Sequence, residues 1–177
     1  MTTERLTVRR IASDDWESMK EIWDDQRRSV YARFDRPNDT NPDAVRQRIG
    51  KWASCENSTE HMFFAVCLNG GVIGYIAFNR REDGYETGYC FHSDYQGKGY
   101  AKESMAALIG AILEKQPDAV ITARTALKNI PSVRLLQSQG FRLTGTEKVS
   151  FYRDEDGKKI DFDGGIYKRL SEFHKNS

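Results

Sequence analysis

The first third of the chain shows one stretch of strand-like periodicity and two of helical periodicity. Residues 6–11 alternate apolar and polar positions, which predicts a short strand. A helix is then expected behind Ser13-Asp14-Asp15, a sequence able to cap a helix start. A second helix is expected from Asn41-Pro42-Asp43, because proline is tolerated in a first helical turn. Their apolar faces are Trp16, Met19, Ile22 and Trp23 in the first helix, and Val45, Ile49 and Trp52 in the second.

The middle of the chain carries the pattern of a β-hairpin followed by a further strand. Met62–Leu68 and Val72–Phe78 are apolar, strand-like runs joined by Asn69-Gly70-Gly71, which suits a tight turn. Asp83-Gly84 marks another turn before a strand over Tyr85–Phe91. Strands joined by such short turns are expected to be antiparallel neighbours in one sheet.

Helices and strands alternate in the rest of the chain. Residues 101–114 place apolar side chains at helical spacing, and Ala119–Ala123 is an apolar run typical of a buried strand. A helix over Pro131–Ser138 is expected to end at Gly140, which suits the left-handed residue after a helix. The last two strands are expected near Phe141–Arg153 and Lys159–Leu170.

This order of elements predicts an α+β fold with mixed strand pairing, in a single domain spanning residues 1–177. Hairpins join the middle strands, whereas helices separate the later ones. Hydrophobic residues make up 38% and charged residues 30% of the chain, which is typical of a globular protein with a hydrated surface.

Charge and cysteine content exclude several classes of protein. The formal net charge is +1 with acidic and basic residues interleaved, so no nucleic-acid partner is expected. No apolar run approaches the ~20 residues of a membrane span, and the N-terminus lacks the apolar core of a signal peptide. Cys55, Cys67 and Cys90 have neither the spacing of a metal site nor that of a disulfide framework. We therefore expect a cytoplasmic protein that needs no metal and no membrane.

The main candidate for chemistry is the loop before the third helix, where Gly97 and Gly99 stand at alternate positions. A helix start leaves backbone N–H groups unpaired at the positive end of the helix dipole. Glycine lets the backbone turn tightly and approach an anion closely. The loop therefore predicts a phosphate or pyrophosphate site.

Two familiar nucleotide-binding patterns do not match this loop. A Walker loop needs glycine where His92 stands, and serine or threonine where Gly99 stands. A dinucleotide fingerprint needs a third glycine where Lys102 stands. A glycine-rich turn with a purely structural role stays open.

A third pattern matches. Gln96-x-x-Gly99-x-Ala101 resembles the acyl-CoA loop of the GCN5-related N-acetyltransferases, the GNAT superfamily, and residues 129–141 resemble its Asn-x-x-Ser helix ending in Gly-Phe. These blocks and several shorter ones cover nearly the whole chain, and together they resemble the RimJ/RimL-like subgroup of ribosomal-protein N-terminal acetyltransferases. The shorter matches are Glu4-Arg5-Leu6 with Arg9, Gly74-Tyr75-Ile76, Glu86-Thr87-Gly88-Tyr89 and residues 161–167.

The resemblance implies a mostly antiparallel sheet of about seven strands, flanked by helices and splayed between the fourth and fifth strands, where acetyl-CoA lies. Backbone groups of Phe91, His92 and Ser93 are expected to pair with the pantetheine arm. The N–H groups of residues 97–102 would hold the pyrophosphate, and Lys98 or Lys102 either adds charge there or is simply solvated. The other expected cofactor-binding residues are Gln96, Gly97, Gly99, Tyr100, Ala101, Asn129 and Ser132.

Acetyl transfer to an amine needs a base for the ammonium and an acid for the leaving thiolate. Glu86 is the candidate base, acting through water, with a surface or salt-bridged role as the alternative. Many family members place an acidic tyrosine where this chain has Leu136; RimJ/RimL-like relatives instead use a serine, here Ser132, for which helix capping is the alternative. His92 is of a residue type suited to base catalysis, but a structural or solvent-exposed role is favoured.

The resemblance implies direct transfer to a primary amine, either a protein N-terminus or a small molecule. The acceptor pocket is expected from residues 23–34 and the last two strands, although the pattern over 26–41 is ambiguous. Because Leu136 removes the commonest acid, a non-catalytic acyl-CoA-binding sensor or structural subunit is the alternative. Homodimerisation stays open. Side chains considered for the acceptor site are Asp24, Asp25 and Asp154 for charge, and Tyr152 and Tyr167 for its lining.

Overall fold

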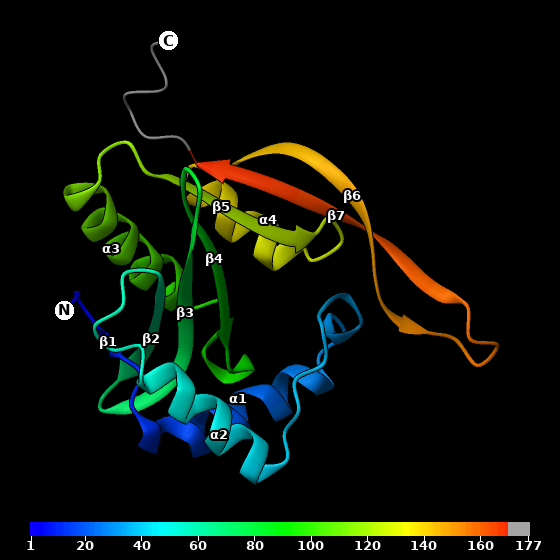
Figure 1. The fold of residues 1–177 in the computed structure, drawn as a ribbon, viewed down its shortest axis with the longest axis horizontal. Coiled ribbons are helices and arrows are strands. Elements are labelled where there is room, and N and C mark those ends of the chain that lie inside the picture. The colour runs from blue at the N-terminus through cyan, green and yellow to red at the C-terminus, as the bar shows by residue number, and fades with distance from the viewer. Residues whose placement is uncertain (170–177) are drawn as a thin grey trace.

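A seven-stranded sheet runs through the molecule in the order β1-β2-β3-β4-β5-β7-β6 (Figure 1). The structure is a computed structural model in which residues 1–169 are described, so the expected end of the last strand at Leu170 lies outside the described residues. The strands are β1 (Thr7–Arg10), β2 (His61–Leu68), β3 (Gly71–Arg81), β4 (Gly84–Phe91), β5 (Val120–Ala126), β6 (Arg142–Arg153) and β7 (Lys159–Arg169).

All neighbouring strands are antiparallel except β4 and β5, which run parallel. These two strands pair only from Gly84 opposite Val120 to Thr87 opposite Ala123. Beyond Thr87 and Ala123 they separate, and Figure 1 shows β5 turning away from β4. The expected α+β sheet, splayed between the fourth and fifth strands, is confirmed.

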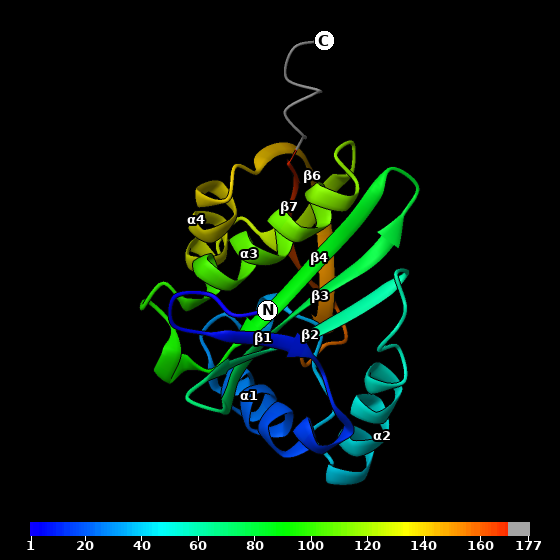
Figure 2. The same cartoon turned by 90° about the vertical axis from the view of Figure 1, so that its left-hand side faces the viewer.

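Four helices cover the two faces of this sheet (Figure 2). One core cluster joins α3 to the sheet through Met105 and Leu108, and includes Leu136 of α4. The other cluster joins α1 and α2 to the opposite face through Trp23 and Ile49. Within residues 1–169, no helix has the length and apolar character needed to cross a membrane. The helices are α1 (Trp16–Arg28), α2 (Pro42–Ala53), α3 (Tyr100–Lys115) and α4 (Ile130–Ser138).

Local sequence explains most element ends. Asn41 caps α2, since its side-chain oxygen accepts hydrogen bonds from the backbone N–H groups of Asp43 at 3.0 Å and Ala44 at 3.4 Å. The turn between β2 and β3 has Asn69 and Gly70 at φ 50° and 86°, as a two-residue hairpin turn requires.

The expected side-chain cap of α1 is wrong. Ser13–Asp15 form a 3₁₀ turn and make no capping hydrogen bond to the helix. The Asp15 carboxylate instead accepts hydrogen bonds from the Ala12 N–H and from both terminal nitrogens of Arg9, each at 2.7 Å. The Asp15 carboxylate is buried, and the two hydrogen bonds from Arg9 of β1 stabilise it more than capping of α1 would.

The ambiguous segment after α1 is held by the far end of the β6–β7 hairpin. It forms a 3₁₀ turn, Ala32–Phe34, whose Phe34 ring lies 5.3 Å from that of Phe162 on β7. The Tyr152 hydroxyl on β6 donates a hydrogen bond of 3.3 Å to the Ala32 carbonyl. These contacts place the residues that follow Phe34 beside the opening between β4 and β5.

Candidate active site

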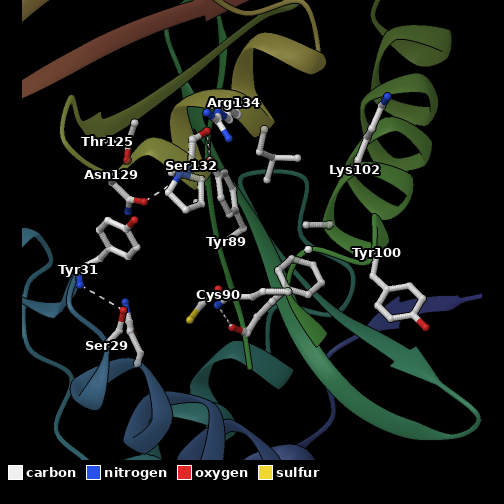
Figure 3. A pocket seen from close by; sticks show the side chains of 18 of the residues that line it. Ser29, Tyr31, Tyr89, Cys90, Tyr100, Lys102, Thr125, Asn129, Ser132 and Arg134 are labelled. Atoms are coloured by element: carbon white, nitrogen blue, oxygen red, sulfur yellow. Dashed lines mark hydrogen bonds between the residues drawn. The ribbon is translucent and has the colours of Figure 1, made fainter. Parts of the chain in front are cut away.

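A cavity of about 540 Å³ occupies the opening between β4 and β5. Figure 3 shows Ser29 and Tyr31 at one end and Lys102 at the other, with Tyr89 and Ser132 between them. The Thr87 hydroxyl, at the last β4–β5 pair, is buried in this lining without a hydrogen-bond partner among the described residues. A buried polar atom without a partner at the floor of a cavity favours a site that holds a polar ligand.

The glycine loop forms one end of the cavity. Gly97 and Gly99 have φ of 72° and 85°, and Gly99 is the residue that precedes α3. The Gln96 side chain donates a hydrogen bond of 2.7 Å to the Phe91 carbonyl, which ties the loop to β4. No side chain caps α3, so its first N–H groups are available to an anion.

Cationic side chains gather on the same side as the loop. Lys102 of α3, Arg124 of β5 and Arg134 of α4 all line the cavity. Lys98 does not line it; its ammonium lies 5.9 Å from the centre of the Tyr95 ring. Arg5 secures the loop from outside, because it donates to the Lys98 carbonyl at 3.0 Å and to the Glu103 carboxylate at 2.7 Å.

The three residues expected to meet the pantetheine arm are placed differently. Phe91 lines the cavity, whereas His92 and Ser93 do not. The His92 N–H donates to the Ile73 carbonyl at 3.1 Å, and the Ser93 N–H donates to the Asp25 carboxylate at 2.7 Å. Both N–H groups are therefore already bonded, and their pairing with pantetheine stays a prediction.

Ser132 is hydrogen-bonded to a tyrosine on the facing strand. The Tyr89 hydroxyl lies 2.8 Å from the Ser132 hydroxyl (Figure 3). Burial raises the pKa of Tyr89 to about 12, although its hydrogen bond to Ser132 acts in the opposite direction. Asn129 caps α4, with its side-chain oxygen 3.4 Å from the Ser132 nitrogen. Sequence reasoning missed Tyr89, since only the pairing of β4 with α4 in space reveals it.

Glu86 lies on β4 before the strands separate, and it is not among the residues that line the cavity. Its carboxylate accepts a hydrogen bond of 3.2 Å from the Arg81 side chain. A base role for Glu86 would therefore have to run through water, and it stays a prediction.

The acidic residues considered for the acceptor site are engaged elsewhere. Asp24 pairs with Lys20 at 2.6 Å, and Asp154 accepts from the Lys158 N–H at 2.8 Å. Asp25 holds Ser93, as described above. Asp35 lines the cavity instead, together with Gln26 and Tyr31. Gln26 and Tyr31 fall within the range 23–34 expected for the acceptor pocket, whereas Asp35 lies one residue beyond it and was missed.

The two tyrosines considered for the acceptor site, Tyr152 and Tyr167, do not line the cavity. Tyr167 is buried in the core, and Tyr152 bonds to Ala32. Leu136, where many relatives have a tyrosine, is fully buried in the core. Within residues 1–169 no group of three or more His, Cys, Asp or Glu side chains is placed to hold a metal ion.

The fold and this cavity define an acetyltransferase. The family model for the acetyltransferase (GNAT) domain matches residues 5–142, so the chain belongs to the GNAT family. It is accordingly an acyltransferase, and its family uses acetyl-CoA as the acetyl donor. The resemblance noted in the sequence is confirmed.

Three similar proteins place the chain within this family. YnaD of Bacillus subtilis, an uncharacterized N-acetyltransferase, is 28% identical over 145 residues, covering 82% of this chain and 84% of YnaD. The ribosomal-protein-S5-alanine acetyltransferase of Vibrio fischeri has a TM-score of 0.80 and 19% identity over 97% of this chain and 96% of that one. RimL, a ribosomal L7/L12 α-N-protein acetyltransferase in complex with coenzyme A, has a TM-score of 0.81 and 15% identity over 97% of each chain. At such identities the two solved structures show only that they share the expected GNAT fold with this chain.

Proposed function

We propose that this protein transfers the acetyl group of acetyl-CoA directly to a primary amine, within the cavity between β4 and β5. The observation that carries the proposal is the order of groups along this cavity. An anion-binding loop with cationic neighbours lies at one end, and the Tyr89–Ser132 hydroxyl pair lies between that loop and the segment after α1. This arrangement suits a donor with phosphates at one end and a reactive thioester at the other.

The residues fit acetyl-CoA as follows. The N–H groups that follow Gly97 and Gly99 would hold the pyrophosphate, with charge from Lys102 and Arg134. The unpaired edge of β4 up to Phe91 would receive the pantetheine arm, as a sheet edge receives a strand. The partnerless Thr87 hydroxyl offers a hydrogen bond at the floor of the opening.

Ser132 would protonate the leaving thiolate. As the new C–N bond forms, the C–S bond breaks and its electron pair stays on sulfur, which needs a proton. Tyr89 keeps its own proton at neutral pH, because its pKa is about 12. Its hydroxyl can therefore donate to the Ser132 oxygen, which leaves the Ser132 proton free to point into the cavity.

The function is tested by measuring thiol release from acetyl-CoA with a panel of amines. The panel contains peptides with free α-amines, peptides whose only amine is a lysine side chain, and the polyamine spermidine. Amine-dependent thiol release, with the acetylated amine identified by mass spectrometry, supports the proposal. Tight acetyl-CoA binding with no turnover on any amine would favour the non-catalytic sensor.

A base role for Glu86 makes a separate prediction. A base at Glu86 would make Glu86→Gln lower turnover on an α-amine most at low pH, by tenfold or more, because the protonated amine then depends most on a base. Glu82→Gln, an exposed neighbour in the turn before β4, is the matched control. A pH profile of Glu86→Gln that is superimposable on that of the wild type removes Glu86 from the mechanism.

A further inference from the structure

The carboxylate of Asp35 lines the cavity. Asp35 is the only acidic side chain among the described residues that line the cavity, whereas three cationic side chains line the part formed by α3, α4 and β5. No Lys, Arg or His side chain within residues 1–169 forms an ion pair with Asp35. A partly buried carboxylate without a cationic partner is costly to folding and calls for an explanation.

A chain of hydrogen bonds orients this carboxylate. Arg48 donates to the Asn38 side-chain oxygen at 2.9 Å, and Asn38 donates to the Gln26 side-chain oxygen at 3.2 Å. Because its oxygen is occupied in this way, the Gln26 amide turns its nitrogen to Asp35 Oδ2, at 2.9 Å. The described residues offer no hydrogen bond to the other oxygen, Oδ1, which is left for a ligand in the cavity.

The position of Asp35 relative to the sheet matters for the chemistry. Tyr89 belongs to the core cluster on the α3–α4 face, and its neighbour Cys90 packs with the α1–α2 cluster on the other face. Asp35 comes from the segment between α1 and α2, and Ser132 comes from α4. The segment that carries Asp35 joins the two helices on one face of the sheet, and Ser132 belongs to a helix on the other face. The incoming amine needs a proton acceptor and the leaving sulfur needs a proton donor, and two separate groups that line one cavity can supply both.

We propose that Asp35, and not Glu86, binds the ammonium group of the acceptor and takes its proton before the amine attacks, which rests on the transferase function proposed above. The proton moves from the ammonium nitrogen to Asp35 Oδ1, and the nitrogen lone pair so released forms the C–N bond. The attacking nitrogen loses a second proton to water as the C–S bond breaks, and water restores to Ser132 the proton that it gives to the sulfur. Asp35 returns the proton to water after the product leaves. The acceptor class is a primary amine that is cationic in solution, and Asp35 supplies the charge that selects it.

The surroundings of Asp35 support this role. Burial raises the pKa of Asp35, against the effect of the Gln26 hydrogen bond, and a carboxylate with a raised pKa is a better proton acceptor. The thiol of Cys90 does not compete with Asp35 as a proton acceptor, because it stays protonated at neutral pH. Burial and the charge of Asp35 raise the pKa of Cys90 to about 12. The charge of Asp35 acts on Tyr75 of β3 and on Tyr89 and Cys90 of β4, and Asp25 of α1 also acts on Cys90. Arg48 of α2 is linked to Asp35 through Asn38 and Gln26.

The test compares Asp35→Asn with the wild type on amines of different pKa at pH 7. Without Asp35, the enzyme can use only the fraction of amine that is already neutral in solution. The expected loss of kcat/KM is about tenfold for an α-amine, with a pKa near 8, and on the order of a thousandfold for a lysine side-chain amine, with a pKa near 10.4. For trifluoroethylamine, which is neutral at pH 7, the loss should be no more than a few-fold. The loss for an α-amine should also shrink as the pH rises past the pKa of that amine.

The controls separate this proposal from a structural role and from the function on which it rests. Asp39→Asn makes the same change four positions along the same segment, at an exposed residue outside the cavity, and should leave kinetics unchanged. A uniform loss for Asp35→Asn across all the amines would overturn the proposal in favour of a structural role. Wild-type activity in Asp35→Asn on the lysine amine would overturn it while leaving the transferase function intact. A wild-type enzyme without turnover on any amine would overturn both.

A stability measurement provides a readout besides activity. The folded-state pKa of Asp35 is raised, so the folded protein binds its proton more tightly than the unfolded chain, and charging Asp35 weakens folding as the pH rises. Asp35→Asn removes that charge but keeps a side-chain oxygen that can accept the hydrogen bond from the Gln26 amide. Its thermal midpoint at pH 7 should equal or exceed that of the wild type, and the difference should disappear at acid pH. A lower midpoint at pH 7 would mean that Asp35 stabilises the fold, which contradicts the proposal.

Discussion

Gly99→Glu is expected to weaken acetyl-CoA binding by about 100-fold or more. The loop is expected to hold the pyrophosphate through backbone N–H groups, and loss of two such charge-assisted hydrogen bonds costs about 3 kcal/mol. A carboxylate in the loop also repels the phosphates. Gly97→Glu should behave similarly, because space is open around the position of its added Cβ. Isothermal titration calorimetry of each variant with acetyl-CoA measures the change in the dissociation constant.

The matched control for this prediction is Gly70→Glu, in the hairpin turn between β2 and β3. Gly70, Gly97 and Gly99 have φ of 86°, 72° and 85°, so all three variants meet left-handed backbone strain of about 1–2 kcal/mol. A Cβ at Gly70 or Gly97 meets open space, whereas a Cβ at Gly99 lies 3.2 Å from a terminal nitrogen of Arg5. Gly70→Glu and Gly97→Glu should lose similar stability, and only the loop variants should lose acetyl-CoA affinity. Wild-type affinity in a folded Gly99→Glu protein would disprove the assignment of the loop.

Ser132→Ala is expected to lower kcat by about 100-fold with little change in acetyl-CoA affinity, since a general acid contributes roughly that much or more. Tyr89→Phe should lower kcat by about tenfold, because Ser132 keeps its proton but loses the donor that orients it. The two residues act as a unit. The double variant should therefore be hardly slower than Ser132→Ala alone, and steady-state kinetics on the best amine gives the comparison.

The control variant is Ser54→Ala. The Ser54 hydroxyl donates a hydrogen bond to the Lys51 carbonyl at the end of α2, outside the cavity. The variant should leave kcat unchanged. Additive losses in the double variant would contradict a shared proton path between Tyr89 and Ser132. A rise in KM for acetyl-CoA at constant kcat would mean that Ser132 serves binding alone.

Much of the fold can be predicted from local sequence. The hairpin turn at Asn69 and Gly70, the cap at Asn41 and the glycine loop before α3 each depend on residues within a few positions of one another. Backbone dihedral preferences and short-range hydrogen bonds decide such features, so the sequence pattern carries them directly. The cap expected at Ser13–Asp15 failed because a strand residue, Arg9, competes for the Asp15 carboxylate.

The pairing of distant polar groups around the cavity could not be predicted in this way. Tyr89 and Ser132 are 43 positions apart, and Tyr152 holds Ala32 from 120 positions away. Such pairs form only when distant segments pack, and no periodicity in either segment encodes the partner. The same reason explains why Asp35 reaches the cavity from a segment with no regular pattern.

By itself, the sequence determined the family of this protein and the order of its elements, and it predicted the loop as the donor site, because those depend on short motifs with fixed spacing. Only the tertiary structure decided which distant side chains meet in the cavity. It brought Tyr89 to Ser132 by packing α4 across the opening in the sheet, and it brought Asp35 to the cavity beside the contact of Phe34 with Phe162. Those positions are set by the burial of apolar surface, because side chains from distant segments lose water and contact one another when the chain folds.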